Sequence, residues 1–283
     1  MNIIRRKKGN KVYSYLKCSF RKKDKVITKE VYLGKSIPKN LRKIKEKLKM
    51  ESKEDKYKTL EKIKDNFQRE WRKLPKSIQE KEKEEIAIVF TYNTNSIEGS
   101  TITLEETKEI IHHQIAPNRP LSDIKETEAH VKVFLEMLDK REEITTELLL
   151  RWHKDIFHET KPDLAGKFRK YLVRVGSYIA PDWQEVKTLI SKLIVFINSS
   201  KLNPVELSAI AHYRFEMIHP FGDGNGRVGR LLMNLILGYN SYPILIIEHR
   251  KRRAYYKALQ GGEDKFVNYF LRTYLRVRKK LTK

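Results

Sequence analysis

The sequence lacks several features that define common classes of protein. It holds a single cysteine, Cys18, in 283 residues, which excludes an internal disulfide framework. No secretory leader and no long apolar run are visible, so we expect a cytoplasmic protein that does not enter a membrane. Acidic residues are scarce beside basic ones, since 36 Asp and Glu face 60 Lys and Arg, a net charge of +24. The length allows one large or two modest domains with a sizeable core.

The excess positive charge lies at the front of the chain. Residues 1–50 hold 18 Lys and Arg against 3 acids, whereas residues 84–283 hold 31 against 25. A basic front end fits a nucleic acid or an acidic protein face, and Tyr13, Tyr15 and Tyr32 fit base stacking. A solvated charged surface is the alternative, because most charge runs are that. Both partners of the front end therefore remain hypotheses.

Periodicity predicts a mainly α-helical chain with little β structure. Residues 3–34 are predicted to form a small basic β module with strands at 12–16 and 26–33, and with turns at Gly9-Asn10 and 21–25. Lys- and Glu-rich residues 38–83 are predicted to form exposed linking helices. A short hairpin at 171–181, turning at Gly176-Ser177, is expected among further helices at 86–98, 103–115, 124–139, 146–157, 186–197, 204–218, 228–236 and 266–274. The predicted domains are 1–37, 38–83 and 84–283.

The chain is organised around the segment His219-Pro220-Phe221-Gly222-Asp223-Gly224-Asn225-Gly226-Arg227-Val228-Gly229-Arg230. The helix before it has a clear start, with Asn203 as N-cap and Pro204 at the first helical position. Apolar residues at 228, 231, 232, 235 and 236 predict a second helix after it. The motif is therefore helix, glycine-rich turn, helix, and the free N–H groups at the second N-terminus form an anion site.

Two arginines, Arg227 and Arg230, lie in the first turns of the second helix, where the macrodipole disfavours cations. They therefore need an anion, and a polyphosphate supplies enough charge. The nearby carboxylate of Asp223 suggests a divalent metal bound to that polyphosphate. The glycines of the turn let such a ligand approach the backbone closely.

Four other interpretations of the motif compete. A G-x-G-x-x-G pattern begins at Gly224, but the dinucleotide fingerprint must follow a strand and a helical pattern precedes it here. A Walker A loop fails because Arg230-Leu231 stands where Lys-Ser/Thr is required. An EF-hand fails because Asn234 stands at position twelve. A purely structural turn explains neither the histidine nor both arginines, although motif matches do carry false positives.

The motif resembles the signature of the Fic family, enzymes that transfer AMP from ATP to protein hydroxyls, and the likeness extends from about residue 86 to 259. The resemblance implies a mainly α, Fic-type helical core with a β-hairpin flap, preceded by the small basic β module. It implies ATP and Mg²⁺ as cofactors and a Ser, Thr or Tyr hydroxyl of a target protein as acceptor. The flap's edge would hold the target by strand addition. The target and the oligomeric state stay open, and a homodimer is compatible with the sequence.

The resemblance also assigns roles to single residues. His219 is the expected general base, since an imidazole with a pKa near neutrality suits that task. Asp223 is expected to hold Mg²⁺, Arg227 to bind the β-phosphate and Arg230 the γ-phosphate. The remaining nucleotide-binding positions are expected to be Val173, Arg174, Val175, Gly176, Gly224, Asn225, Gly226, Val228, Gly229 and Tyr256. Seven residues past Tyr256 the family often has Asn, and the Glu263 of this chain leaves the preference for ATP open.

Residues 94–99 resemble the inhibitory motif of the family, Ser/Thr-x-x-x-Glu-Gly/Asn, with Thr94, Glu98 and Gly99 at the specified positions. A glutamate in the last turn of a helix faces the negative end of the dipole, which is unfavourable unless a cation compensates. In the family this glutamate pairs with the second motif arginine, here Arg230, and obstructs the γ-phosphate. An exposed Glu without a role is the alternative.

Two rival functions remain open at this point. One is the reverse reaction, hydrolytic removal of AMP from a modified protein, with Glu98 positioning the water. The other is a basic nucleic-acid-binding protein whose Fic-like core only senses nucleotide, for which a steep salt dependence of affinity is the discriminating property.

Overall fold

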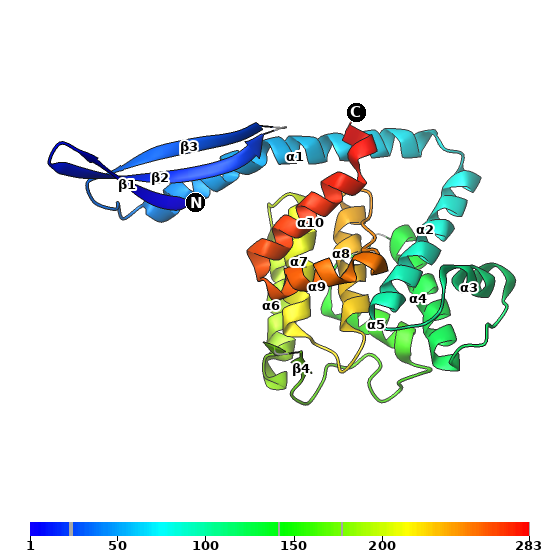
Figure 1. The fold of residues 1–283 in the computed structure, drawn as a ribbon. Coiled ribbons are helices and arrows are strands. Elements are labelled where there is room, and N and C mark those ends of the chain that lie inside the picture. The colour runs from blue at the N-terminus through cyan, green and yellow to red at the C-terminus, as the bar shows by residue number, and fades with distance from the viewer. Residues whose placement is uncertain (23–24, 141, 177, 283) are drawn as a thin grey trace. The chain divides into compact units, whose positions relative to one another are not determined.

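The computed structural model describes residues 1–22, 25–140, 142–176 and 178–282. It divides into two compact units, residues 1–63 and 64–283, with the division inside the long helix α1 (Leu41–Lys73). The chain is mainly helical with a small N-terminal sheet and one further hairpin (Figure 1), which confirms the predicted fold class. The domain boundaries at residues 37 and 83 stay predictions. Within the described residues, no helix is both long enough and apolar enough to cross a bilayer.

Unit 1 consists of an antiparallel sheet and the first part of α1. Strand β1 (Asn2–Lys8) pairs with β2 (Lys11–Lys22), which pairs with β3 (Lys25–Gly34). Strand β1 was not among the predicted strands, because its sequence shows no alternation of apolar and polar residues. One side of the sheet packs on α1 through a small core of Leu16, Cys18, Leu33 and Leu48. Residues 23–24 of the predicted second turn lie outside the described residues.

Unit 2 is built from helices around one apolar core. Its helices are α2 (Lys76–Ile97), α3 (Leu104–Lys108), α4 (Leu121–Asp139), α5 (Thr146–Phe157), α6 (Val186–Ser199), α7 (Pro204–Ile218), α8 (Asn225–Tyr239), α9 (Arg252–Gln260) and α10 (Glu263–Val277). Short 3₁₀ turns lie at Trp183–Glu185, His249–Lys251 and Lys279–Thr282. Helices α7 and α8 pack against each other, and the side chains of the core include Phe90, Phe134, Trp152, Ile190, Phe215 and Leu231.

Three helix ends follow signals in the sequence. The predicted capping box of α3 is present, since Thr103 and Glu106 each accept a hydrogen bond from the other's backbone N–H. The side chain of Asn203 accepts from the N–H of Val205 at 3.0 Å and starts α7. Gly99, with φ 103°, takes the left-handed conformation just beyond α2 that glycine favours. Local chemistry therefore determines where these helices begin or end.

Candidate active site

His219 directly follows α7 and begins the motif loop. Its backbone is left-handed, with φ 50° and ψ 61°, a conformation that side-chain-bearing residues rarely adopt. The imidazole is half-buried, and its Nδ1 has no hydrogen-bond partner among the described residues. Burial lowers the pKa of His219 and the charge of Arg169 lowers it further, whereas a hydrogen bond with the backbone of Glu216 and the charges of Glu98 and Asp223 raise it. The imidazole is therefore neutral near pH 7 and able to accept a proton.

The buried side chain of Arg169 fixes the start of the motif loop through hydrogen bonds to backbone carbonyls. Its Nε donates to the carbonyl of His219 at 2.8 Å, and its two terminal nitrogens donate to the carbonyls of Tyr171 and Pro181, each at 2.7 Å. Tyr171 and Pro181 flank the hairpin made of β4 (Arg174–Val175) and β5 (Tyr178–Ile179). One buried guanidinium therefore joins His219 to both ends of this hairpin.

The middle of the loop is held by side chains that point into the core. Asn225 accepts from the N–H of Phe221 at 2.8 Å and donates to its carbonyl at 2.9 Å. The buried ring of Phe221 stacks on His153 with centroids 3.9 Å apart. His153 accepts from the N–H of Gly166 through Nδ1, so Nε2 carries the proton and donates to the carbonyl of Asp223 at 3.0 Å. Burial lowers the pKa of His153 to about 4, which keeps this ring neutral.

Helix α8 begins within the glycine-rich turn, and its first N–H groups are available to an anion. The first N–H groups of α8 belong to Asn225, Gly226 and Arg227. No turn of α8 precedes them, so the helix offers them no carbonyl acceptor. Gly224 has φ 75°, and a Cβ there would lie 2.3 Å from the ring of Phe157. A Cβ on Gly226 would lie 2.1 Å from Oε1 of Glu98. Close contacts with Phe157 and Glu98 therefore require glycine at both positions, and the close approach of a ligand to this backbone stays a prediction.

The structure brings Glu98 and Arg230 together. Arg230 is fully buried, and its Nη2 lies 2.6 Å from Oε1 of Glu98, whose side chain is 31% exposed. Arg230 also donates to the hydroxyl and the carbonyl of Thr94, each at 3.3 Å. Burial alone would lower the pKa of Arg230, but the charge and hydrogen bond of Glu98, together with the charges of Tyr255 and Glu216, raise it. Arg230 supplies the cation that a glutamate at the C-cap of α2 requires.

Arg227 pairs with a different carboxylate, that of Glu126 on α4. Both side chains are buried, and the guanidinium lies over the ring of Phe157 at 4.3 Å. Glu126 also accepts from Lys161 at 2.6 Å and from Thr160 at 2.8 Å. Burial alone would raise the pKa of Glu126, but the Arg227 charge and these hydrogen bonds lower it. Arg227 is therefore held in place before any ligand arrives.

Asp223, the predicted metal ligand, faces two cations. Lys161 Nζ lies 3.0 Å from its Oδ2, and Arg227 Nη2 lies 3.9 Å from its Oδ1. Burial alone would raise the pKa of Asp223, but the hydrogen bond from Lys161 and the charge of Arg227 lower it, so the carboxylate is ionised. No group of three or more His, Cys, Asp or Glu in the described part of the chain is arranged for a metal. One half-exposed carboxylate beside the predicted phosphate site fits Mg²⁺, which takes one or two carboxylates and completes its shell with phosphate and water.

The hairpin is bonded to the end of α7, and Tyr256 is bonded to the end of α2. In the hairpin, Arg174 pairs with Ile179 and Val175 with Tyr178, Gly176 has φ 59°, and residue 177 lies outside the described residues. The hydroxyl of Tyr178 donates to the carbonyl of Met217 at 3.0 Å. The hydroxyl of Tyr256 donates to the carbonyl of Ile97, next to Glu98, at 3.1 Å. Arg174 and Val175 are exposed, and Val173 is half-buried.

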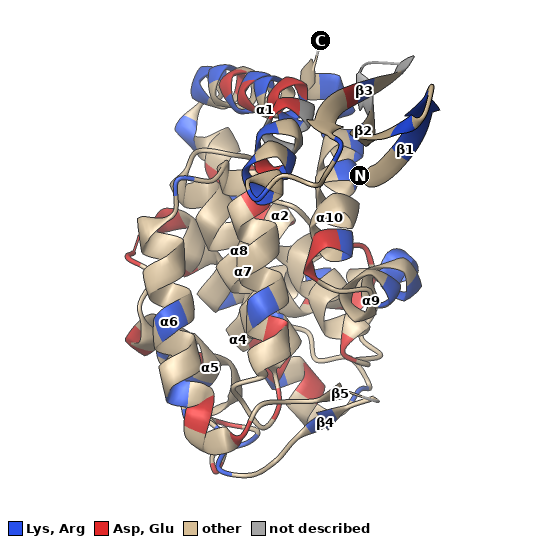
Figure 2. Cartoon of the chain, turned by 90° about the vertical axis from the view of Figure 1, so that its left-hand side faces the viewer, with Lys and Arg blue, Asp and Glu red and all other residues tan. Residues whose placement is uncertain are grey.

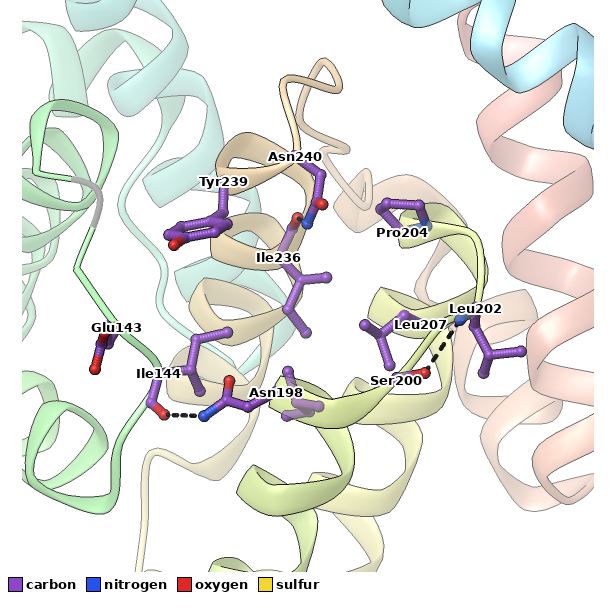
Figure 3. A pocket seen from close by; sticks show the side chains of 11 residues that line it. Glu143, Ile144, Asn198, Ser200, Leu202, Pro204, Leu207, Ile236, Tyr239 and Asn240 are labelled. Atoms are coloured by element: carbon purple, nitrogen blue, oxygen red, sulfur yellow. Dashed lines mark hydrogen bonds between the residues drawn. The ribbon is translucent and has the colours of Figure 1, made fainter.

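A cavity of about 500 Å³ lies away from these residues, at the C-terminal end of α8 (Figure 3). Its walls include Ile144, Leu207 and Ile236, with Glu143 and Tyr239 beside them. Helix α8 has 15 residues, so its two ends are separated by about 22 Å at 1.5 Å per residue. None of the residues predicted to form the site lines this cavity.

Known proteins resemble this chain in sequence and in fold. Residues 143–237 match the model of the Fic/DOC family. Proteins named protein adenylyltransferase Fic from Culex quinquefasciatus and Drosophila ananassae are each 33% identical, over 196 and 197 residues. These matches cover 66% and 67% of this chain but 39% and 40% of the relatives, so the chain spans about two fifths of their length.

This chain belongs to the Fic/DOC family. Two solved structures share its fold, each with a TM-score of 0.70. One is a Fic-domain-containing signaling protein from Bacteroides thetaiotaomicron, 22% identical, covering 80% of this chain and 96% of that one. The other is Fic-1 from C. elegans, 23% identical, covering 85% of this chain and 75% of that one.

Four residues of this Fic protein hold the site without having been predicted as part of it. They are Glu126, His153, Lys161 and Arg169, and each bonds to a motif residue through its side chain. Of these four, only Glu126 could have been recognised from the sequence, because an ionisable residue on the buried face of a predicted helix is rare unless it is paired. Glu263, the departure from the family pattern, is engaged by Arg214 at 2.8 Å.

Proposed function

We propose that this Fic protein transfers AMP from ATP to a Ser, Thr or Tyr hydroxyl of a target protein, and that Glu98 restrains the transfer. The observation that carries the proposal is the pairing of Glu98 with Arg230 at 2.6 Å. Arg230 lies on α8, the helix that directly follows His219 and the glycine-rich turn. The base and the anion site then lie on the motif loop and the start of α8, and the obstructing carboxylate reaches Arg230 from the end of α2. The names of the relatives support transfer of AMP over its removal.

His219 acts on the acceptor hydroxyl. Its neutral imidazole takes the proton, and the oxygen attacks the α-phosphorus of ATP. A bond forms between that oxygen and phosphorus while the bond from phosphorus to the bridging oxygen of the β-phosphate breaks. Pyrophosphate leaves, AMP remains on the protein, and the imidazolium later returns its proton to solvent.

The start of α8 binds the phosphates. The N–H groups of Asn225 and Gly226 point to where charge changes during transfer, and such preorganised donors are a major source of rate. Arg227 binds the β-phosphate and Arg230 the γ-phosphate, while Tyr256 lines the site of the base. When bound at Asp223, Mg²⁺ supplies positive charge to the phosphate oxygens.

Glu98 restrains the reaction because its carboxylate is bound to the guanidinium of Arg230, which the γ-phosphate would otherwise bind. The same carboxylate would position a water molecule in the alternative reaction, hydrolytic removal of AMP from a modified protein. The two reactions make opposite predictions for a substitution of Glu98, since loss of this carboxylate would accelerate AMP transfer but stop AMP removal.

The test is incubation of the purified chain with α-labelled ATP, Mg²⁺ and a cell lysate, followed by mass spectrometry of the labelled proteins. His219→Ala is expected to lower labelling by about 10²–10⁴-fold, the usual contribution of a general base. Binding of ATP, measured by calorimetry, should change little because His219 does not contact phosphate in this mechanism. Undiminished self-labelling of His219→Ala would contradict the proposal.

A second function, binding of single-stranded nucleic acid, is favoured for unit 1 by its tyrosines. The ring of Tyr32 lies 6.0 Å from that of Tyr13 and 5.4 Å from that of Tyr15, and Arg6 stands 5.3 Å over Tyr15. Side chains alternate along a strand, so these rings lie on the face opposite the core. Aromatic platforms beside cations suit stacked bases, and Figure 2 shows Lys and Arg in blue along β1.

Fluorescence anisotropy with labelled single-stranded RNA and DNA tests this second function. Tyr32→Ala should cost about 1–3 kcal/mol of binding free energy, and affinity should fall steeply with salt. Tyr57→Ala, on α1, is the control. Equal binding of an acidic protein and of RNA would instead indicate a general anion surface.

A further inference from the structure

Exposed apolar side chains gather on the hairpin of unit 2. The described part of this unit has thirteen exposed large apolar side chains, and six of them lie between residues 171 and 183: Tyr171, Leu172, Val175, Tyr178, Ile179 and Trp183. Single exposed apolar residues are ordinary, but a cluster of them marks an interaction surface. The hairpin therefore has the composition of a surface that another chain covers.

A cavity of about 300 Å³ lies between this hairpin, α6 and α7. Apolar side chains form most of its wall, and two cations, Lys192 and Arg214, complete it; the apolar members are Pro181, Leu189, Leu193, Met217 and Ile218, with Tyr178 from the hairpin. Pockets for small ligands span about 300–1,000 Å³, so this one is at the small end of the range. Its size suits one large apolar side chain of a docked segment.

The cavity borders the proposed base. Ile218 lines it and directly precedes His219, and the hydroxyl of Tyr178 is bonded to the carbonyl of Met217. An extended chain advances about 3.3–3.6 Å per residue. A side chain seated in the cavity therefore belongs to a residue one or two positions from a hydroxyl presented to His219.

The charges around the cavity favour an acidic partner. Lys192 is exposed and has no ion-pair partner among the described residues, whereas Arg214 is held by Glu263 at 2.8 Å. Between residues 170 and 192 the exposed charged side chains are Lys170, Arg174, Lys187 and Lys192 against Asp182 and Glu185. Complementary potentials select partners and like charges reject them. A second copy of this chain would present the same positive surface, so an acidic segment fits better.

We propose that this cavity docks a large apolar side chain of the target protein, one or two residues from the hydroxyl that receives AMP, with an acidic residue of the target against Lys192. The proposal rests on the proposed AMP transfer and narrows its substrate to extended segments of this composition.

Degenerate peptides with a fixed Ser, Thr or Tyr test the pocket, with α-labelled ATP and the full chain. One position within two residues of the hydroxyl should prefer Leu, Ile, Phe or Met over Ala by about tenfold or more, as pocket contacts usually allow. Another position should prefer Asp or Glu. Lys192→Glu should reverse that charge preference toward Lys and Arg, while the control Lys201→Glu, at an exposed lysine that does not line the cavity, should keep it.

A second variant tests the cavity by its volume. Leu189→Trp should shift the apolar preference toward small side chains, and Val195→Trp, at an exposed position of the same helix, is its control. If Leu189→Trp fails to fold, the charge reversal in Lys192→Glu decides alone. Three results would each contradict docking in this cavity. They are peptide labelling without positional preference, self-labelling without any peptide labelling, and a changed oligomeric state in Leu189→Trp. Absence of self-labelling in the unaltered chain would contradict the transferase itself.

Discussion

Two arginine–glutamate pairs lie next to the motif loop, and they differ in how firmly the carboxylate is held. Glu126 stands within α4, is 8% exposed, and accepts hydrogen bonds from Lys161 and Thr160 besides its bond with Arg227. Glu98 stands at the C-cap of α2, is 31% exposed, and pairs with Arg230. Freeing Glu98 requires movement at one helix end, whereas freeing Glu126 breaks several interactions in the interior. The Glu126–Arg227 pair therefore supports the fold, whereas the Glu98–Arg230 pair permits release of Glu98 from Arg230.

The largest effect is expected from Glu126→Ala. This change leaves Arg227 buried without its partner, and breaking a buried ion pair from one side costs about 3–5 kcal/mol of stability. Chemical denaturation measures the loss, and Glu128→Ala on the same helix, at a half-buried position, is the control with an expected change near 0.5 kcal/mol or less. A similar small change in both variants would show that the first pair does not support the fold.

Glu98→Gly should raise AMP transfer by about one to two orders of magnitude, because a charge-assisted hydrogen bond of about 1.5–3 kcal/mol no longer holds Arg230. Self-labelling with α-labelled ATP measures the increase. Arg230→Ala should suppress transfer, and the double variant should stay inactive, since Arg230 serves both states while Glu98 only obstructs. Lower labelling by a folded Glu98→Gly protein would remove Glu98 from its inhibitory role.

Lys161→Met should strengthen metal binding at Asp223 by about fivefold, since it removes a competing cation whose pairing is worth roughly 1 kcal/mol. Paramagnetic resonance of Mn²⁺ measures this without catalysis, and Lys167→Met, at an exposed lysine nearby, is the control. Weaker binding of metal-free ATP in Lys161→Met, with unchanged affinity for Mn²⁺, would instead make Lys161 a phosphate ligand.

The smallest effect concerns pH. The pKa of His219 is lowered below its ordinary value of 6.5, and transfer requires the unprotonated ring, so kcat/KM should rise with pH through a pKa below 6.5 and then stay level. Because Glu98 raises the pKa of His219, Glu98→Gly should move this limb to lower pH. A limb at or above 6.5 would argue against a buried imidazole as the base.

The motif and its opposing glutamate could be recognised in the sequence because each is encoded by short spacings. Asn203 and Gly99 similarly mark helix ends through local hydrogen bonds and backbone conformation. The mainly helical fold followed from apolar periodicity, which covers most of the chain.

The residues that hold the motif could not be recognised in this way. Arg169 bonds to His219 across 50 positions, and Glu126 bonds to Arg227 across 101. Contacts of this separation depend on how helices pack, and neither periodicity nor spacing encodes them. Strand β1 escaped for a different reason, because its side chains show no alternation and its pairing with β2 alone makes it a strand.

The space beside Gly226 has a genetic consequence. A side chain there would collide with Oε1 of Glu98 at 2.1 Å and with Arg230 at 2.9 Å, and the same backbone is the proposed seat of the phosphates. A mutation at position 226 that displaced Glu98 would thus also disturb the proposed phosphate site, so few such variants should be active. If Glu98 restrains transfer as proposed, constitutively active variants should arise by changes on α2 instead, and selection for nucleotide binding would preserve the space that Glu98 occupies.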